Sequence, residues 1–293
     1  MLLIDKQLQN KLKYFAWCMR ESLKFDTSCP ACRCLHTRSL KRKKIVTALY
    51  ECTTCGLRFR VPKDNLSTNM AFYQENYLDG VSGNMPSDAE LNKFLTTGDT
   101  GQPPHWGGNY HPYILVLKAS GLGDGACVLD FGASWGYGSY QLQEAGFKVM
   151  AYEISQPRAR YAFEKLGINI ITDLYHPPNS IDCFFSAHVM EHLPDPNIIW
   201  KSTLSALKPS GLFVAFVPNG DPIIKNLHGS KRYQKTWGLL HPLLITSWHL
   251  RYMASRYGFD ANLYSSPYQL NDIKNRKDGD LSGIELCIIA RRK

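Results

Sequence analysis

The chain has 293 residues, of which 44% are hydrophobic and 20% are charged. This composition suits a globular protein with one full core and room for a small second domain. The sequence contains no apolar run of the roughly 18 residues needed to span a bilayer, and Asp5 and Lys6 interrupt the apolar start too early for a secretory signal. We therefore expect a cytoplasmic protein without a transmembrane segment.

Positive charge is concentrated at the start of the chain. Residues 1–63 contain 14 Lys and Arg against 4 Asp and Glu, whereas the remainder contains 20 against 21. Such asymmetry can mark a contact with nucleic acid or an anionic membrane, although a solvated basic face is at least as common. The basic amino-terminal region therefore leaves a nucleic-acid partner open.

Two cysteine pairs follow a predicted basic amphipathic helix over residues 1–25. They are "CPAC" and "CTTC", with 19 residues between them. Four thiolates at this spacing form two tight knuckles that place their sulfurs about 2.3 Å from one zinc ion. A complete shell of four leaves no position for a catalytic water. The sequence therefore predicts a structural zinc bound by Cys29, Cys32, Cys52 and Cys55.

The cysteine pairs belong to a predicted zinc ribbon over residues 26–65. Apolar and polar residues alternate in "KKIVTALYEC" and "GLRFRV", which predicts two strands, and Gly56 suits the turn of the second knuckle. We expect Cys34 and His36 to lie outside the metal shell. Residues 66–120 are predicted to form a linker and helical cover, with Tyr73 and Tyr77 over a ligand site.

The stretch "VLDFGASWGYGSY", residues 128–140, runs from an apolar strand into a glycine-rich loop. After a predicted helix, the strand "KVMAYEIS" carries Glu153, 23 residues beyond Asp130. An acidic side chain at this strand end can accept hydrogen bonds from both hydroxyls of a ribose. Because the charge of Asp130 would repel a diphosphate but suit an amine or sulfonium, the loop predicts a nucleoside cofactor carrying positive charge.

The remaining segments alternate between predicted strands and helices. The strands are "INIITD", "SIDCFFSA", "LFVAFVP" and, last in the chain, "IELCIIARR". The helix in "PDPNIIWKSTLSALKPSG" is predicted to start with Asp195 as N-cap and Pro196 at its first position, and to stop at Gly211. This alternation predicts an α/β fold with a doubly wound, mostly parallel sheet and ligands beyond the carboxyl ends of its strands.

Over residues 121–293 the chain resembles the class I S-adenosylmethionine-dependent methyltransferases. The resemblance rests on "VLDFGASWGYG", "AYEIS", "SIDCFFSAHVMEHLPDP" and "LKPSGLFVAFVPNGDP", in that order. The small-molecule enzymes of ubiquinone and sugar pathways, some of which carry an amino-terminal zinc segment, are the most similar in style. The resemblance implies a seven-stranded Rossmann-like fold and S-adenosyl-L-methionine as cofactor.

The resemblance also implies roles for individual residues. Gly132, Ser134 and Gly136 would line the methionine moiety, Glu153 would bind the ribose, and Asp173 would lie near the adenine. Ser134 stands where the family usually has a glycine. The predicted cofactor set is Asp130, Gly132, Ser134, Gly136, Glu153, Asp173 and Ser186.

Candidates for proton removal from the acceptor lie in two places. The tract "SAHVMEH" follows the fourth predicted strand and carries His188, Glu191 and His192. In ubiquinone-type enzymes the matching tract starts with an acid and can hold a divalent metal, whereas His188 replaces that acid here. We predict His188 as a general base, because an unperturbed histidine titrates near neutral pH. The alternative is that Glu191 and His192 only cap the following turn.

The second place is the long insertion over residues 219–259, between the fifth strand and the next helix. Loops at this edge of the sheet commonly cover the substrate, and His241 is the predicted histidine of such a lid. The alternative is that His241 is an ordinary packed loop residue.

The predicted function is methyl transfer from S-adenosylmethionine to a small polar metabolite or sugar-type acceptor. An RNA methyltransferase whose basic ribbon grips phosphates is the first alternative. The tract after the fourth strand disfavours it, because it lacks the N-P-P-Y pattern of enzymes that methylate base amino groups. A non-catalytic S-adenosylmethionine-binding protein is the second alternative, which the glycine loop and acidic ribose residue disfavour.

Overall fold

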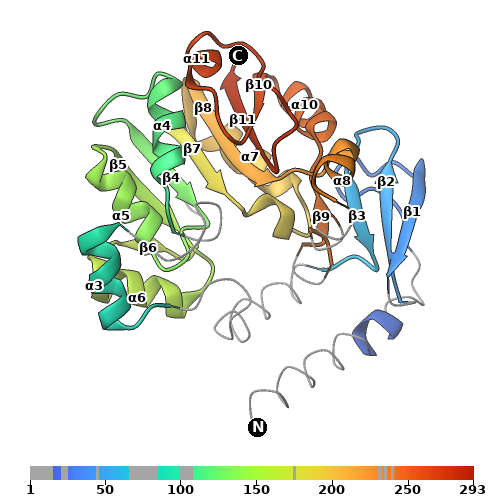
Figure 1. Cartoon of the computed structure of the whole chain (residues 1–293), viewed down its shortest axis with the longest axis horizontal. Helices are drawn as coiled ribbons and strands as arrows, with labels where there is room; N and C mark the ends of the chain where they lie inside the picture. Colours follow the sequence, from blue (N-terminus) through green and yellow to red (C-terminus); the bar gives the residue numbers. More distant parts are fainter. Residues whose placement is uncertain are drawn as a thin grey trace.

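The computed structural model describes residues 16–20, 26–43, 46–65, 85–98, 108–173, 176–229, 233, 236–238 and 241–293. Two β-sheets lie side by side, a large one with helices around it and a small one built mainly from the amino-terminal region (Figure 1). Of the predicted helix over residues 1–25, only residues 16–20 are described, and they are helical. Tyr73 and Tyr77 lie outside the described residues.

The large sheet has seven strands in the order β10-β11-β8-β7-β4-β5-β6. All neighbouring pairs from β8 to β6 are parallel, and only β11 runs antiparallel to its neighbours β8 and β10. The doubly wound, mostly parallel α/β fold is therefore confirmed, with the last strand of the chain inside the sheet. The strands are β4 Cys127–Phe131, β5 Lys148–Tyr152, β6 Ile170–Ile171, β7 Ile181–Ala187, β8 Leu207–Pro218, β10 Phe259–Ser265 and β11 Glu285–Arg292.

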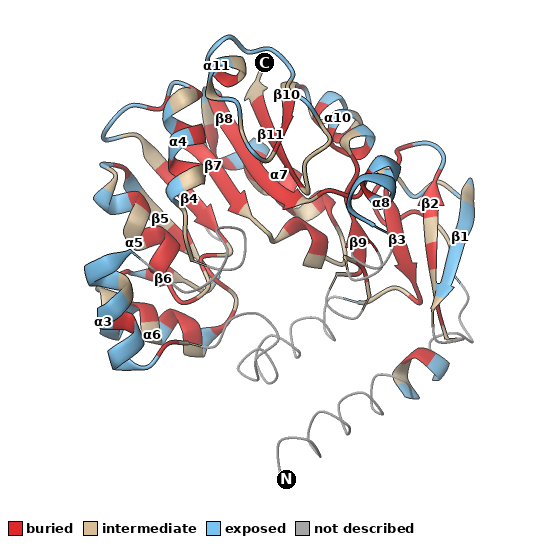
Figure 2. Cartoon of the chain, viewed as in Figure 1, coloured by how far each residue is buried: buried red, intermediate tan, exposed pale blue. Residues whose placement is uncertain are grey.

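Helices cover both faces of this sheet, so its strands bury side chains on both sides. Cys183 and Phe185 of β7 face the cluster that contains residues of helices α4 (His111–Ala119) and α11 (Leu270–Lys274). Phe184 faces the cluster that contains residues of helices α7 (Asn197–Ala206) and α10 (Ser247–Arg256). Figure 2 shows β7, β8 and β11 buried along most of their length. The helices are α3 Asp88–Thr97, α4 His111–Ala119, α5 Tyr137–Glu144, α6 Gln156–Leu166, η1 Met190–His192, α7 Asn197–Ala206, α8 Pro222–His228, α10 Ser247–Arg256 and α11 Leu270–Lys274.

No helix in these described ranges combines the length and apolar character that crossing a bilayer requires.

Helix α7 differs from its prediction at both ends. Pro196, not Asp195, occupies the N-cap, although the Asp195 carboxylate accepts a hydrogen bond from the backbone N–H of Asn197 at 3.0 Å. The helix ends at Ala206, before the predicted stop at Gly211, because pairing with β7 already begins at Leu207. Pairing between strands therefore overrides the local stop signal.

The small sheet has the order β1-β2-β3-β9 and is antiparallel. Its strands are β1 Thr37–Lys43, β2 Thr47–Cys52, β3 Arg58–Val61 and β9 Leu243–Leu244. The sequence predicts β2 and β3 but neither β1 nor β9. In Figure 1, β9 lies beside β3 although it comes from the distant insertion after β8.

The two sheets share one hydrophobic core. Phe59 of β3 and Leu57, which precedes that strand, belong to the same buried cluster as Leu250 and Met253 of α10. The shared core and β9 join the ribbon to the carboxyl-terminal part. The division into residues 1–25, 26–65, 66–120 and 121–293 stays a prediction.

Candidate active site and cysteine cluster

The carboxyl ends of β4, β5 and β7 converge at one edge of the large sheet. The glycine-rich loop follows β4, Glu153 follows β5, and the tract from His188 to His192 follows β7. The chain passes from β4 to β5 on one side, while β7 lies on the other side of β4. This switch in strand order is where open α/β sheets bind ligands.

The glycine-rich loop has a left-handed backbone at Gly132, Ser134 and Gly136, with φ of 89°, 53° and 88°. A Cβ atom at Gly132 would lie 2.3 Å from Cγ2 of Val189, so a side chain there would collide with the protein itself. Ser134 takes up the left-handed conformation that a glycine would adopt more easily. The loop geometry therefore depends on packing against the tract after β7.

Glu153 is buried and held by backbone groups. Its Oε2 accepts a hydrogen bond from the N–H of Ser134 at 3.0 Å, and its Oε1 accepts one from the N–H of Ser155 at 2.9 Å. Burial raises the pKa of Glu153, although these N–H groups and the charge of Arg158 oppose the shift. Backbone N–H groups therefore use part of the hydrogen-bonding capacity of this carboxylate, and the rest can receive a hydroxyl donor.

Arg158 is a buried residue of this site that the sequence reasoning missed. Its Nη1 donates a hydrogen bond to the Ser134 hydroxyl at 2.6 Å. Arg158 lies in the first turn of α6, where a cation opposes the helix dipole and needs a nearby anion. That placement is the signal that points to a carboxylate such as Glu153.

Asp130 at the end of β4 is fully buried, and its Oδ2 accepts a hydrogen bond from the Ser139 hydroxyl at 2.6 Å. Burial raises the pKa of Asp130 to about 7, in spite of hydrogen bonds from Ser139 and Tyr110. The hydroxyl of Ser186 in β7 is buried and has no hydrogen-bond partner within the described part of the chain. Asp173 lies exposed just beyond β6.

His188 has a left-handed backbone, with φ of 55°, and lies between two buried carboxylates. Its Nε2 is 2.6 Å from Oε2 of Glu285, and its Nδ1 is 3.3 Å from Oε1 of Glu191. Burial alone would lower the pKa of His188, but these two carboxylates raise it to about 10. At neutral pH both ring nitrogens therefore carry protons, and this geometry does not favour the predicted base role.

Glu285 and two tyrosines complete the surroundings of His188, and the sequence reasoning missed all three. The Tyr113 hydroxyl donates a hydrogen bond to Oε2 of Glu285 at 2.9 Å, and the Tyr268 hydroxyl donates one to Oε1. The residues come from α4, the connection after β10, and β11. No spacing along the chain indicates this cluster, because only the sheet order brings its members together.

Glu191, His192 and His241 form a second cluster, in which one donor atom of each residue lies within 4.8 Å of the others. The His192 and His241 rings meet edge to face, with centroids 4.6 Å apart. Burial would raise the pKa of Glu191, but His188, His192 and His241 lower it to about 2. The structure therefore places the predicted lid histidine beside the tract after β7.

His241 is oriented by its own loop. Its Nδ1 lies 3.1 Å from the carbonyl oxygen of Thr236, which favours the tautomer with the proton on Nδ1. Nε2 is then the nitrogen that can accept a proton. Two other histidines of the insertion lie elsewhere: His228 contacts the carbonyl of Ser282, and His249 is buried against Cys55 with a pKa lowered to about 4 by burial.

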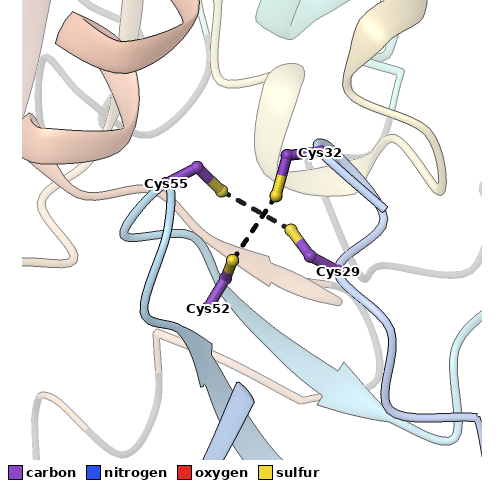
Figure 3. Close-up of side chains that lie close together, drawn as sticks. All are labelled: Cys29, Cys32, Cys52 and Cys55. Carbon is purple, nitrogen blue, oxygen red and sulfur yellow. Dashed lines mark hydrogen bonds between the residues drawn. The ribbon is translucent and has the colours of Figure 1, made fainter. Parts of the chain in front are cut away.

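The four predicted metal ligands lie together, with their sulfurs pointing toward one another (Figure 3). Sγ of Cys29 is 3.5 Å from Sγ of Cys55, and Sγ of Cys32 is 3.5 Å from Sγ of Cys52. Four sulfurs at 2.3 Å around a tetrahedral zinc would be about 3.8 Å apart, so the cluster has nearly the size of a zinc shell.

Each cysteine pair ends in a left-handed residue, as a knuckle turn requires. Arg33 follows the first pair with φ of 62°, and Gly56 follows the second with φ of 71°. Cys34 lies outside the cluster and accepts hydrogen bonds from the Thr54 hydroxyl and the N–H of His36. The knuckle geometry therefore follows the spacing that the sequence predicts.

Residues 111–264 match a family model described as a methyltransferase domain. The match covers more than half of the chain. The chain belongs to this methyltransferase family. Its fold, its glycine loop and its acidic residue after the second strand make it a class I S-adenosylmethionine-dependent methyltransferase, as the sequence resemblance implies. Comparison with curated proteins found no match.

Solved structures of methyltransferases match this chain at low sequence identity. An N-methyltransferase 2 from Haemonchus contortus, solved with phosphomonomethylethanolamine and S-adenosylhomocysteine, is 14% identical with a TM-score of 0.50, covering 76% of this chain and 60% of that one. A methyltransferase from Archaeoglobus fulgidus is 18% identical with a TM-score of 0.47, covering 62% and 91%. A complex between the Haloferax volcanii Trm112 methyltransferase activator and a methyltransferase shows 15% sequence identity and a TM-score of 0.49. The match covers 71% of this chain and 99% of that one.

The buried carboxyl of Asp130 predicts a pH dependence of stability in the methyltransferase without cofactor. Its pKa of about 7 in the folded state lies above the ordinary value of 3.8, so folding favours the protonated form. The stabilising contribution is complete below pH 3.8 and is lost as the pH rises through about 7. Relative to Asp130→Asn, the parent should lose free energy of unfolding across this range, by at most about 1.4 kcal/mol per pH unit.

Urea unfolding of both proteins at several pH values measures this difference. The amide oxygen that replaces the carboxylate in Asp130→Asn can still accept the Ser139 hydrogen bond, so packing is preserved in the variant. Identical pH slopes for the two proteins would show that Asp130 is not protonated on folding.

Proposed function

We propose that this methyltransferase acts on a small polar metabolite or sugar-type acceptor whose proton is removed by His241. The observation that carries the proposal is the cluster of Glu191, His192 and His241 beside the carboxyl end of β7. Methyl transfer is an in-line displacement, so a hydroxyl acceptor needs alignment and a base to take its proton. An imidazole next to a fixed carboxylate meets the second need.

The cofactor residues support S-adenosylmethionine binding at the switch point. Glu153 would accept the ribose hydroxyls, Asp130 would face the positively charged portion, and the loop from Gly132 through Ser134 to Gly136 would contact the methionine moiety. Ser186 would add its unpartnered hydroxyl, and Asp173 would lie near the adenine. When bound, the cofactor supplies an electrophilic methyl group on its sulfonium.

Proton removal is assigned to His241 and Glu191. Glu191 is anionic at neutral pH, and its Oε2 has no hydrogen-bond partner among the residues described. Nε2 of His241 can take the acceptor's proton as the oxygen–methyl bond forms, with the carboxylate of Glu191 close by in the same cluster. His188 keeps its own protons and, with Glu285, holds Glu191 in place.

Replacing His241 tests the proposed function. Transfer of a tritiated methyl group from S-adenosylmethionine is measured on a panel of sugars, sugar phosphates and polyols, with total RNA as a parallel substrate. For an accepted small molecule, His241→Gln should lower kcat by about 100- to 10,000-fold, because the base is lost. The affinity for S-adenosylhomocysteine should not change.

His228→Gln is the matched control, because His228 lies in the same insertion and its Nε2 contacts the carbonyl oxygen of Ser282, away from the cluster of Glu191, His192 and His241. Methylation of RNA alone would contradict the small-molecule acceptor. A second bound metal ion that disappears in His241→Gln would contradict the base role, since the metal would occupy Nε2.

Replacing Glu153 tests the cofactor assignment. Glu153→Ala removes two charge-assisted hydrogen bonds to the ribose, each worth about 1.5 to 3 kcal/mol, so S-adenosylhomocysteine should bind roughly 100-fold more weakly or worse. Titration calorimetry measures the affinity, and thermal melting confirms that the variant is folded. Unchanged affinity would remove the ribose assignment.

We also propose that Cys29, Cys32, Cys52 and Cys55 hold one structural zinc ion per chain. The distances between their sulfurs and the two left-handed knuckle residues support this proposal. Elemental analysis of the native protein should find one zinc ion per chain, and Cys52→Ser should lose it because three thiolates bind more weakly than four. Cys34→Ser should keep the metal, since Cys34 lies outside the shell. Zinc-free native protein, or full zinc in Cys52→Ser, would contradict the site.

A further inference from the structure

The basic side chains of the small sheet make contacts within the chain. Arg60 in β3 is completely buried, and its Nη1 donates a hydrogen bond to the carbonyl oxygen of Gly238 at 2.8 Å. The backbone N–H of Arg60 donates to the carbonyl oxygen of Pro242 at 2.7 Å. One residue of the ribbon thus holds the chain on both sides of His241.

Two more cations of the small sheet contact the same insertion. Nζ of Lys43 donates a hydrogen bond to the carbonyl oxygen of Trp237 at 3.0 Å and lies 4.9 Å from the centre of its indole ring. Nη1 of Arg58 donates to the carbonyl oxygen of Gly220 at 3.1 Å, while its other nitrogens pair with Glu51. Three ribbon cations therefore bind backbone carbonyls along the insertion that carries His241.

These contacts satisfy both the N–H donors of the buried arginine and the carbonyl acceptors of the insertion. A buried guanidinium is unfavourable unless its N–H groups find acceptors, and Arg60 finds Gly238, Pro62 and Asp64. Irregular backbone that is buried also needs donors for its carbonyls, because it has no ladder of its own. The ribbon supplies such donors to the carbonyl oxygens of Gly220, Trp237 and Gly238 in the insertion.

We propose that Arg60 is a positioning residue for His241, and that the ribbon serves as the support of the acceptor side of the active site. This inference rests on the proposed function, since it assigns the support to the proposed base. It also gives a structural role to three cations of the basic amino-terminal region, Lys43, Arg58 and Arg60, because their side chains donate hydrogen bonds within the protein.

The ring tautomer of His241 reports its position directly and needs no acceptor substrate. In the parent, nitrogen-15 NMR of histidine side chains should show His241 with its proton on Nδ1, because that atom faces the Thr236 carbonyl. His241→Gln assigns the signal. Arg60→Met should release the loop, so that the signal moves toward a mixture of tautomers and methyl transfer to the accepted small molecule falls at least about tenfold.

Arg38→Met is the matched control, because the Arg38 side chain extends from β1 to pair with Glu51 of β2, within the small sheet. Zinc content and affinity for S-adenosylhomocysteine should match the parent in both variants. Lys43→Met, which removes the milder contact to Trp237, should shift the tautomer in the same direction and serves if Arg60→Met does not fold.

The proposal would be overturned if, in both Arg60→Met and Lys43→Met, His241 kept its proton on Nδ1 and methyl transfer proceeded at the rate of the parent. An equal shift in Arg38→Met would also overturn it, because the effect would then come from general loosening of the ribbon. A shifted tautomer in Arg60→Met together with full methyl transfer in His241→Gln would leave the positioning role intact and refute the base role alone.

Discussion

Two carboxylates buried at one end of the large sheet set the strongest physical constraint on this methyltransferase. Glu191 and Glu285 are almost inaccessible to solvent, and two such charges repel each other unless a cation lies between them. His188 fills that position and remains protonated as a result. The glycine loop in turn rests on Val189, the next residue, so the cofactor loop and the ion cluster depend on the same turn.

The small sheet also packs directly against the helices of the large sheet. Its knuckles pack on α7 and α10, where Asn197 donates a hydrogen bond to the carbonyl of Ala31 and Thr246 donates one to the carbonyl of Gly56. Trp248 covers Gly56 so closely that a Cβ atom there would lie 2.7 Å from the indole ring. The cysteine cluster is therefore part of the body that carries the insertion, in keeping with the shared core.

The sequence predicts well what is encoded locally. Strand β4, the glycine loop and Glu153 follow from a short stretch of chain, and the paired cysteines follow from their spacing alone. The predicted end of helix α7 at Gly211 was wrong, because β8 already pairs with β7 from Leu207 and no local pattern indicates that pairing.

The parts that could not be predicted depend on contacts between distant residues. His188 as an isolated side chain has the chemistry of a base, but the carboxylates of Glu191 and of Glu285, nearly one hundred residues later, raise its pKa and keep it protonated. The contacts of the basic amino-terminal region also could not be predicted from the sequence. Its charge is visible in the sequence, whereas the carbonyls that Arg58 and Arg60 bind are visible only once the insertion is placed.

The pairing of β3 with β9 also constrains how the chain is made. Arg58 and Phe59 leave the ribosome long before their partners Leu244 and Leu243, so β3 is an open sheet edge during most of synthesis. An unpaired edge is a template for aggregation until it is covered. The nascent ribbon therefore passes through an exposed interval that ends only after the fifth strand of the large sheet has emerged. Arg58 and Arg60 lie on the strand that forms this edge, and charged side chains on edge strands are one way in which proteins discourage pairing with another copy.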